Sequence, residues 1–219
     1  TEVNGDTNIK YLAKYDGNSW QPVHDVEIGT GSIDDFIYYG DELYIAGNFK
    51  IKGTDIIDIA VYRNGSWQKV GGGLTGPLTG VSDLEVYKGE LYAGGLIIKA
   101  SGNPGHTLIK WDGTSWSEPG YGLRDHGGGS SLASKVNDLE VHDDYLYVVG
   151  EFYSFGDENS TPLESVARWD GESWCSFQGS NDVFYGQAVS MGFYQDTMFI
   201  YGGSDSINGE ANNRFLKCG

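Results

Sequence analysis

The chain has 219 residues and a net charge of −17 at pH 7, because 31 Asp and Glu outnumber 14 Lys and Arg. Binding to a phosphate backbone needs clustered cations, so this balance argues against a nucleic-acid partner and indicates a well-hydrated surface. The sequence contains no apolar run long enough to cross a bilayer.

Residues 9–20 read as a strand, a tight turn and the start of a second strand. The turn is Asp16-Gly17, and glycine supplies the positive φ that such turns need. Trp20 opens the second strand. Residues 1–8 are polar, and we expect them to fray. The chain therefore enters half-way through a repeated unit.

Residues 33–67 supply the first full unit, whose four strands we call positions A, B, C and D. Position A alternates apolar and polar residues, which is the period of two expected for a strand. Position B ends in Gly47, the turn Asn64-Gly65 follows position C, and Trp67 opens position D. The same order recurs in three further stretches, which are residues 81–116, 136–174 and, in part, 189–218.

The tryptophans that open position D set the period of the repeat. They stand at 20, 67, 116 and 174 and are separated by 47, 49 and 58 residues. A period of roughly 40–50 residues built from strands alone is typical of a β-propeller. Their strict repetition beside a turn predicts that these tryptophans pack between neighbouring blades.

We therefore predict an all-β fold, a β-propeller of four-stranded antiparallel blades. It has four or five blades, and the N-terminal and C-terminal hairpins together close the last one. Residues 1–219 are predicted to form this single domain. Its copies are residues 9–31 (partial), 32–76, 77–129, 130–184 and 185–219 (partial). The alternative is that the chain is a piece of a longer propeller.

The order of these signals resembles the kelch repeat. It is still more similar to the propeller repeats of secreted and surface proteins of Bacteroidetes-type bacteria, which read W-D-G-x-x-W and L-Y-x-G-G-x-F. The matching stretches are residues 111–116, 169–174, 43–49, 91–95 and 146–152. Asn64, Cys218 and the segment after Gly203 depart from the pattern. The resemblance covers nearly the whole chain and implies the fold, and it says little about the ligand.

The two cysteines are candidates for a disulfide. Cys175 follows a position-D tryptophan and Cys218 lies near the end of the chain. A bridge between them holds a fraying last repeat to the preceding copy, provided that the compartment is oxidising. Two free thiols are the alternative.

One end of the sheets is predicted to carry the binding site. The A-B and C-D turns are short and uniform, whereas the B-C and D-A loops at the other end are long and differ in every copy, and variable loops on a rigid scaffold commonly bind partners. The candidate binding residues lie in or beside these loops and are Tyr121, His126, Tyr153, Phe155 and Phe184. The alternative is neutral drift of surface loops.

Three carboxylates recur at the start of position A, namely Asp35, Asp83 and Asp138. If position A is innermost, they ring the mouth of the central channel, where a calcium ion is conceivable because hard cations take oxygen ligands. The alternative is that each accepts local backbone N–H bonds. No other cofactor is expected. The sequence shows neither a nucleophile elbow nor a phosphate-binding loop.

These features together favour a non-catalytic β-propeller that is extracellular or attached to the cell surface. No signal peptide is present at Thr1, so we expect it to have been removed. The predicted role is protein–protein contact through the loop face. The alternative is a lectin that binds surface glycans, and a hydrolase or oxidase on a propeller scaffold comes third, because 31 acidic residues supply many accidental carboxylate pairs.

Overall fold

A computed structural model of the chain describes residues 11–23, 26–76, 80–120, 122–124, 134–152, 154–155, 165–176, 184–207 and 215–218. These residues form β-strands and one short 3-10 helix, η1 (Lys99–Ser101). This confirms the all-β prediction. The described residues contain no helix long and apolar enough to span a membrane.

Four antiparallel sheets follow one another in chain order. The first sheet is β3 (Ile28–Tyr39), β4 (Glu42–Ile51), β5 (Ile57–Arg63) and β6 (Ser66–Lys69). The second is β7 (Gly80–Tyr87), β8 (Glu90–Leu96), β9 (Leu108–Trp111) and β10 (Trp116–Ser117). The third is β12 (Lys135–His142), β13 (Tyr145–Glu151), β15 (Val166–Trp169) and β16 (Trp174–Ser176). The fourth is β17 (Phe184–Tyr194), β18 (Thr197–Ile207) and β19 (Phe215–Cys218).

Two small pairs of strands complete the described elements. The N-terminal hairpin is β1 (Ala13–Tyr15) with β2 (Trp20–Pro22), and the second pair is β11 (Leu123–Arg124) with β14 (Ser154–Phe155). In each four-stranded sheet the strands lie in the order A, B, C, D. The repeated four-stranded antiparallel unit is therefore confirmed.

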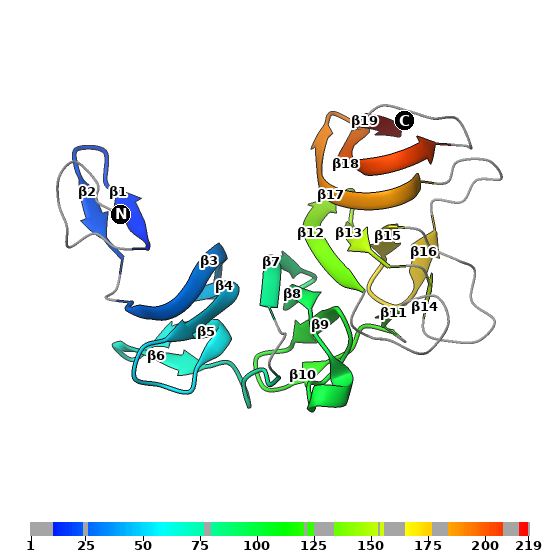
Figure 1. The fold of residues 1–219 in the computed structure, drawn as a ribbon. Helices are drawn as coiled ribbons and strands as arrows, with labels where there is room; N and C mark the ends of the chain where they lie inside the picture. The colour runs from blue at the N-terminus through cyan, green and yellow to red at the C-terminus, as the bar shows by residue number, and fades with distance from the viewer. Residues whose placement is uncertain are drawn as a thin grey trace.

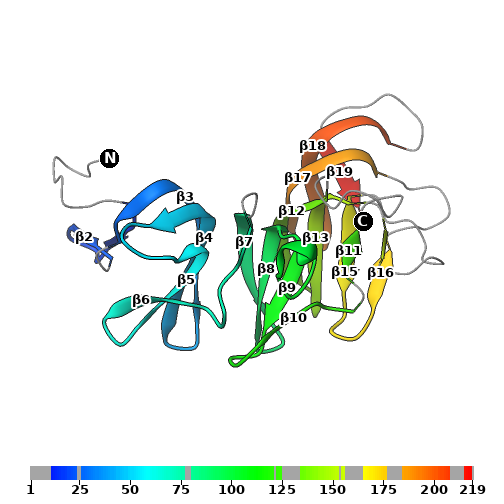
Figure 2. The same cartoon turned by 60° about the horizontal axis from the view of Figure 1, so that its bottom comes forward.

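The sheets stand side by side in a row that curves from the N-terminal hairpin to the fourth sheet (Figure 1). The same order is visible in the second view (Figure 2). The position-A strands of neighbouring sheets contact each other along this row, as β7 does with β3 and β12. We call the side of a sheet that packs on the preceding sheet its leading face, and the opposite side its trailing face.

The apolar core lies between the sheets. Tyr44 and Ala46 on the trailing face of the first sheet share one cluster with Leu84 and Ala93 on the leading face of the second. Equivalent clusters join the second sheet to the third and the third to the fourth. A single sheet cannot bury both of its faces, so stacking supplies the burial that holds the repeats together.

A β-bulge at the same place in every position-A strand explains the glycine that ends position B. The pairing shifts by one residue just before Asp35, Asp83, Asp138 and Ser190. Opposite each bulge, a carbonyl approaches the partner strand so closely that a Cβ on the glycine there would lie 2.0–2.2 Å from it. The four glycines are Gly47, Gly95, Gly150 and Gly202. Only glycine fits, because it has no Cβ.

The C-D turns explain the Asp-Gly part of the repeat. Asp112 Oδ1 accepts the backbone N–H groups of Thr114 and Ser115, both at 2.7 Å, and Gly113 takes a positive φ of 95°. Asp16 and Asp170 make the same pair of bonds. The first sheet departs from this pattern, because Arg63 pairs with Ser66 across the two-residue turn Asn64-Gly65.

The predicted closure of the ring by the two terminal hairpins is wrong for the described residues. The composite blade requires β1 to pair with β18, but β1 pairs with β2, and β19 occupies the place beside β18. The N-terminal hairpin and the fourth sheet lie at opposite ends of the row in both views (Figures 1 and 2). The sequence pattern does not separate β19 from β1 as a partner, because both are short strands of the same repeat position.

Candidate functional site

The three predicted carboxylates each reach the next sheet. Asp35 Oδ2 accepts the backbone N–H of Leu84 at 2.9 Å, and Asp83 Oδ2 accepts that of Leu139 at 2.6 Å. Asp138 Oδ2 accepts the backbone N–H of Met191 at 2.6 Å. We call Asp35, Asp83 and Asp138 the inter-sheet carboxylates. The bulge positions them, because it turns the start of each position-A strand toward its neighbour.

The environment of Asp83 favours its protonated form. Burial raises the pKa of Asp83 well above its usual range, against the lowering effect of the N–H of Leu139. The negative charges of Asp35 and Asp138 and a hydrogen bond with the Asp138 side chain raise the pKa further. Two carboxyl groups that share a site do not both ionise easily. When Asp83 is protonated, the Asp138 side chain is an acceptor for its proton, and the Leu139 N–H keeps its bond to Asp83 Oδ2.

Two glutamates extend this acidic region along the position-A strands. Burial raises the pKa of Glu85, and Glu140, Asp35 and Asp138 add to the effect. Burial followed by the charge of Asp138 raises the pKa of Glu140 in the same way. The position-A strands of the second and third sheets thus carry acidic side chains that resist ionisation.

The sequence offered backbone hydrogen bonding as the alternative to a cation site. The carboxylates do accept backbone N–H groups, and they do so from the next sheet as well as locally. Both oxygens of Asp83 accept backbone N–H groups, since Oδ1 takes that of Leu84 at 2.9 Å. Ser190 donates its hydroxyl to Asp138 Oδ2 at 2.9 Å. The carboxylates therefore join neighbouring sheets. Calcium at this place stays a prediction.

The loop between β8 and β9, residues 97–107, is the best-described part of the loop face. Asn103 lies buried in it and donates to the backbone carbonyls of Thr75 and Ile98 at 2.8 and 3.1 Å. Its side-chain oxygen accepts the N–H of Thr75 at 2.8 Å. Lys99 forms an ion pair of 2.7 Å with Glu118, a largely buried carboxylate. The loop is therefore held in one conformation by its neighbours.

The structure describes only part of the five predicted binding residues. Tyr121, His126 and Tyr153 lie outside the described residues. Phe155 ends β14 and Phe184 begins β17, and the structure describes the backbone of both but not their side chains. Their role in binding stays a prediction.

The disulfide also stays a prediction. Cys175 is a free cysteine in β16. Cys218 ends β19, and its side chain is outside the described part of the chain.

Two of the four repeated tryptophans, Trp116 and Trp174, pack between sheets, as predicted, whereas Trp20 is 42% exposed. Trp116 contacts the cluster between the first and second sheets, and its indole N–H donates to the carbonyl of Val70 at 3.0 Å. Trp174 makes the equivalent bond to Pro119 at 3.2 Å. Each also pairs with the aromatic residue that precedes its turn, with Trp111 and Trp116 ring centroids 5.3 Å apart. These rings are not free platforms for sugars.

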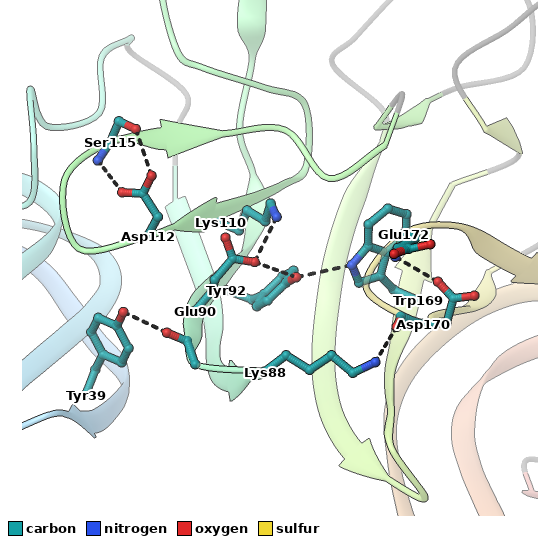
Figure 3. A network of polar contacts seen from close by, with 11 residues as sticks. Tyr39, Lys88, Glu90, Tyr92, Lys110, Asp112, Ser115, Trp169, Asp170 and Glu172 are labelled. Carbon is teal, nitrogen blue, oxygen red and sulfur yellow. Dashed lines mark hydrogen bonds and ion pairs between the residues drawn. The ribbon is translucent and has the colours of Figure 1, made fainter.

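A second set of contacts between sheets, at the turn end, was missed by sequence reasoning (Figure 3). Tyr39 donates its hydroxyl to the carbonyl of Gly89 in the next sheet at 2.9 Å. Tyr87, which the figure does not draw, donates to the carbonyl of Asp144 at 2.6 Å. Lys88 donates to the carbonyl of Asp170 at 2.6 Å. The available signal was the tyrosine that ends position A in most copies.

His142 stands at this tyrosine position in the third sheet. Its ring stacks on Phe193 of the fourth sheet, with ring centroids 4.0 Å apart. Ligand-type atoms of His142, Asp143 and Asp196 lie within 4.8 Å of one another, although both aspartates are exposed. The stacking gives His142 a packing role between the sheets.

No protein-family model matches the chain, and a search of curated proteins found no relative. The fold and the contacts define its class by themselves. It is an all-β protein of blade-like antiparallel sheets, joined by repeated aspartate and tyrosine hydrogen bonds.

Proposed function

We propose that the chain is a non-catalytic, exported module whose sheets are the blades of a β-propeller and whose B-C and D-A loops bind a protein partner. The observation that carries the proposal is the difference between the two ends of the sheets. At the turn end, aspartate and tyrosine contacts repeat from copy to copy. At the loop end, residues 97–107 form a structure of their own, held by Asn103 and Glu118.

This difference favours binding for an energetic reason. A loop that is already ordered loses little conformational entropy when a partner binds, so more of the contact energy remains as affinity. Asn103 and Glu118 provide that order for the loop of the second sheet. The net charge of −17 favours a partner with a basic surface, since complementary charge increases the rate of association.

The experiment locates the partner contact on the surface. A photo-cross-linking amino acid is introduced at Ser101 in the loop and, as the matched control, at Thr114 in the C-D turn of the same sheet. The partner that co-purifies from the native source should cross-link to the Ser101 variant and not to the Thr114 variant. Cross-linking from Thr114 alone would place the interface at the turn end and contradict the proposal.

A glycan array on the same purified chain tests the lectin alternative. Binding to several sugars, with no protein partner recovered, would replace the protein-binding proposal with carbohydrate recognition. Because Trp116 and Trp174 pack between sheets, these two rings would not take part in such binding.

A further inference from the structure

The two ends of the row of sheets carry large exposed side chains, several of them at positions that are buried inside the row. Among the described residues, nearly all exposed large hydrophobic side chains lie in the N-terminal segment, the first sheet or the fourth sheet. The two end faces are different. At one end of the row, the leading face of the first sheet has no preceding sheet to pack on. At the other end, the trailing face of the fourth sheet has no following sheet.

The leading face of the first sheet is only partly covered. Phe36 is 56% exposed, whereas Leu84 and Leu139, at the same position in the second and third sheets, are 4% and 3% exposed. Leu12 of the N-terminal segment packs with Ile45 near the middle of this face. The N-terminal segment covers the start of β3 at Ile28 but leaves its later part open, with Phe36 and Tyr38 facing solvent.

The trailing face of the fourth sheet is open in the complementary way. Phe199 is 41% exposed, whereas the tyrosines at its position in the first three sheets are at most 6% exposed. These tyrosines are Tyr44, Tyr92 and Tyr147. Tyr201 is 45% exposed, whereas Ala46 and Val149 at its position are completely buried. Each buried equivalent is covered by the leading face of the following sheet.

The hydrogen-bonding groups of the two end faces also match. Tyr194 occupies the position of Tyr39 and Tyr87, which donate to the second residue of the next A-B turn. Tyr194 is 69% exposed. The corresponding acceptor on the open leading face is the carbonyl of Asp41, the second residue of the turn between β3 and β4.

We propose that the trailing face of the fourth sheet docks on the leading face of the first sheet of a second copy of the chain. Both faces belong to the one type of junction that the chain already makes between its sheets, so they are halves of the same interface. They lie at opposite ends of the row in both views (Figures 1 and 2), so they do not meet within one copy.

Two copies joined in this way satisfy both pairs of faces at once. Such a head-to-tail contact forms a ring if the rotation closes. Two chains supply about eight sheets, within the range of roughly four to eight blades found in propellers. This surface is separate from the loop face, and the ring leaves the loop face free for its partner.

The first test is the mass of the purified chain in solution. Light scattering after size-exclusion chromatography should show a dimer that dissociates on dilution. Phe199→Asp should weaken the dimer by about 100-fold in Kd, because an aromatic anchor is replaced by a desolvated charge. Val141→Thr is the matched control, at the position of Tyr38 but in the third sheet, and it should leave the dimer unchanged.

The decisive test mixes two variants. A leading-face variant, Phe36→Asp with Tyr38→Asp, and a trailing-face variant, Phe199→Asp, should each be monomeric alone. Their 1:1 mixture retains one intact interface and should form a heterodimer. Circular dichroism of each variant checks that the sheets are intact. A wild-type chain that stays monomeric at high concentration, or a mixture that does not associate, would overturn the proposal.

Discussion

The junction between the second and third sheets and the open face of the fourth sheet are built from the same repeat positions. At the junction, Asp83 and Tyr87 bond to the backbone of the third sheet, and Tyr92 is buried between the sheets. At the open face, Ser190 replaces the aspartate, and Tyr194 and Phe199 are exposed. The difference teaches that the neighbouring sheet, and not the sheet itself, decides whether a repeat position is core or surface.

The largest expected effect comes from the glycine opposite the bulge. In Gly95→Ala the new Cβ would lie 2.1 Å from the carbonyl oxygen of Gly80. The bulge in β7 must therefore change shape, and Asp83, which follows the bulge, moves with it. We expect a loss of stability on the order of 3 kcal/mol, measured by urea unfolding.

The adjacent glycines of β18 are the control at the open end. Gly202→Ala brings a Cβ to 2.0 Å from the carbonyl oxygen of Gln187, whereas a Cβ at Gly203 meets nothing within 4 Å. Gly202→Ala should behave like Gly95→Ala, and Gly203→Ala should change the stability by no more than about 0.5 kcal/mol. Equal losses in the two variants would show that the bulge is not the cause.

The next largest effect concerns the inter-sheet carboxylate at the closed junction. Asp83→Ala leaves the backbone N–H of Leu139 without its acceptor and should cost about 1–3 kcal/mol of unfolding free energy. Asp83→Asn keeps an oxygen for this N–H and a donor for Asp138, so at pH 7 it should lose much less unfolding free energy than Asp83→Ala. If Asp83→Asn lost as much unfolding free energy as Asp83→Ala, the result would contradict a neutral Asp83.

A smaller effect separates two equivalent tyrosines. Tyr87→Phe removes the bond of 2.6 Å to the Asp144 carbonyl and should destabilise the chain by about 0.5–1.5 kcal/mol. Tyr194→Phe removes the same hydroxyl at the open face and should leave the unfolding free energy of the monomer unchanged. Both are measured by urea unfolding at low protein concentration, where any dimer has dissociated.

A further effect of Asp83 is a change in the slope of stability with pH. The pKa of Asp83 is raised in the folded chain, so above the ordinary carboxyl range the folded state holds a proton that the unfolded state has lost. By linkage, this group makes stability fall as pH rises from near 4 to its raised pKa. Asp83→Asn should remove that part of the slope in urea unfolding from pH 4 to 8. An unchanged slope would mean that Asp83 is ionised at the junction.

The sequence alone determined the repeat. Alternating residues, Asp-Gly turns and the spaced tryptophans predicted the four-stranded antiparallel unit and its order, because strand period and turn chemistry are local properties. The packing role of Trp116 and Trp174 also followed from their repetition. The inter-sheet carboxylates were located, but only as a ring of acids, and the bonds to Leu84, Leu139 and Met191 were not foreseen.

The tertiary structure decided what joins one repeat to the next. The partner of Asp83 lies 56 residues away in the chain, and no local pattern specifies it. β18 pairs with β19 and not with β1. The two candidate strands are similar in sequence, so the pairing depends on where they lie in space. Phe199 and Tyr92 have the same place in the repeat, and only the presence of a following sheet makes one surface and the other core.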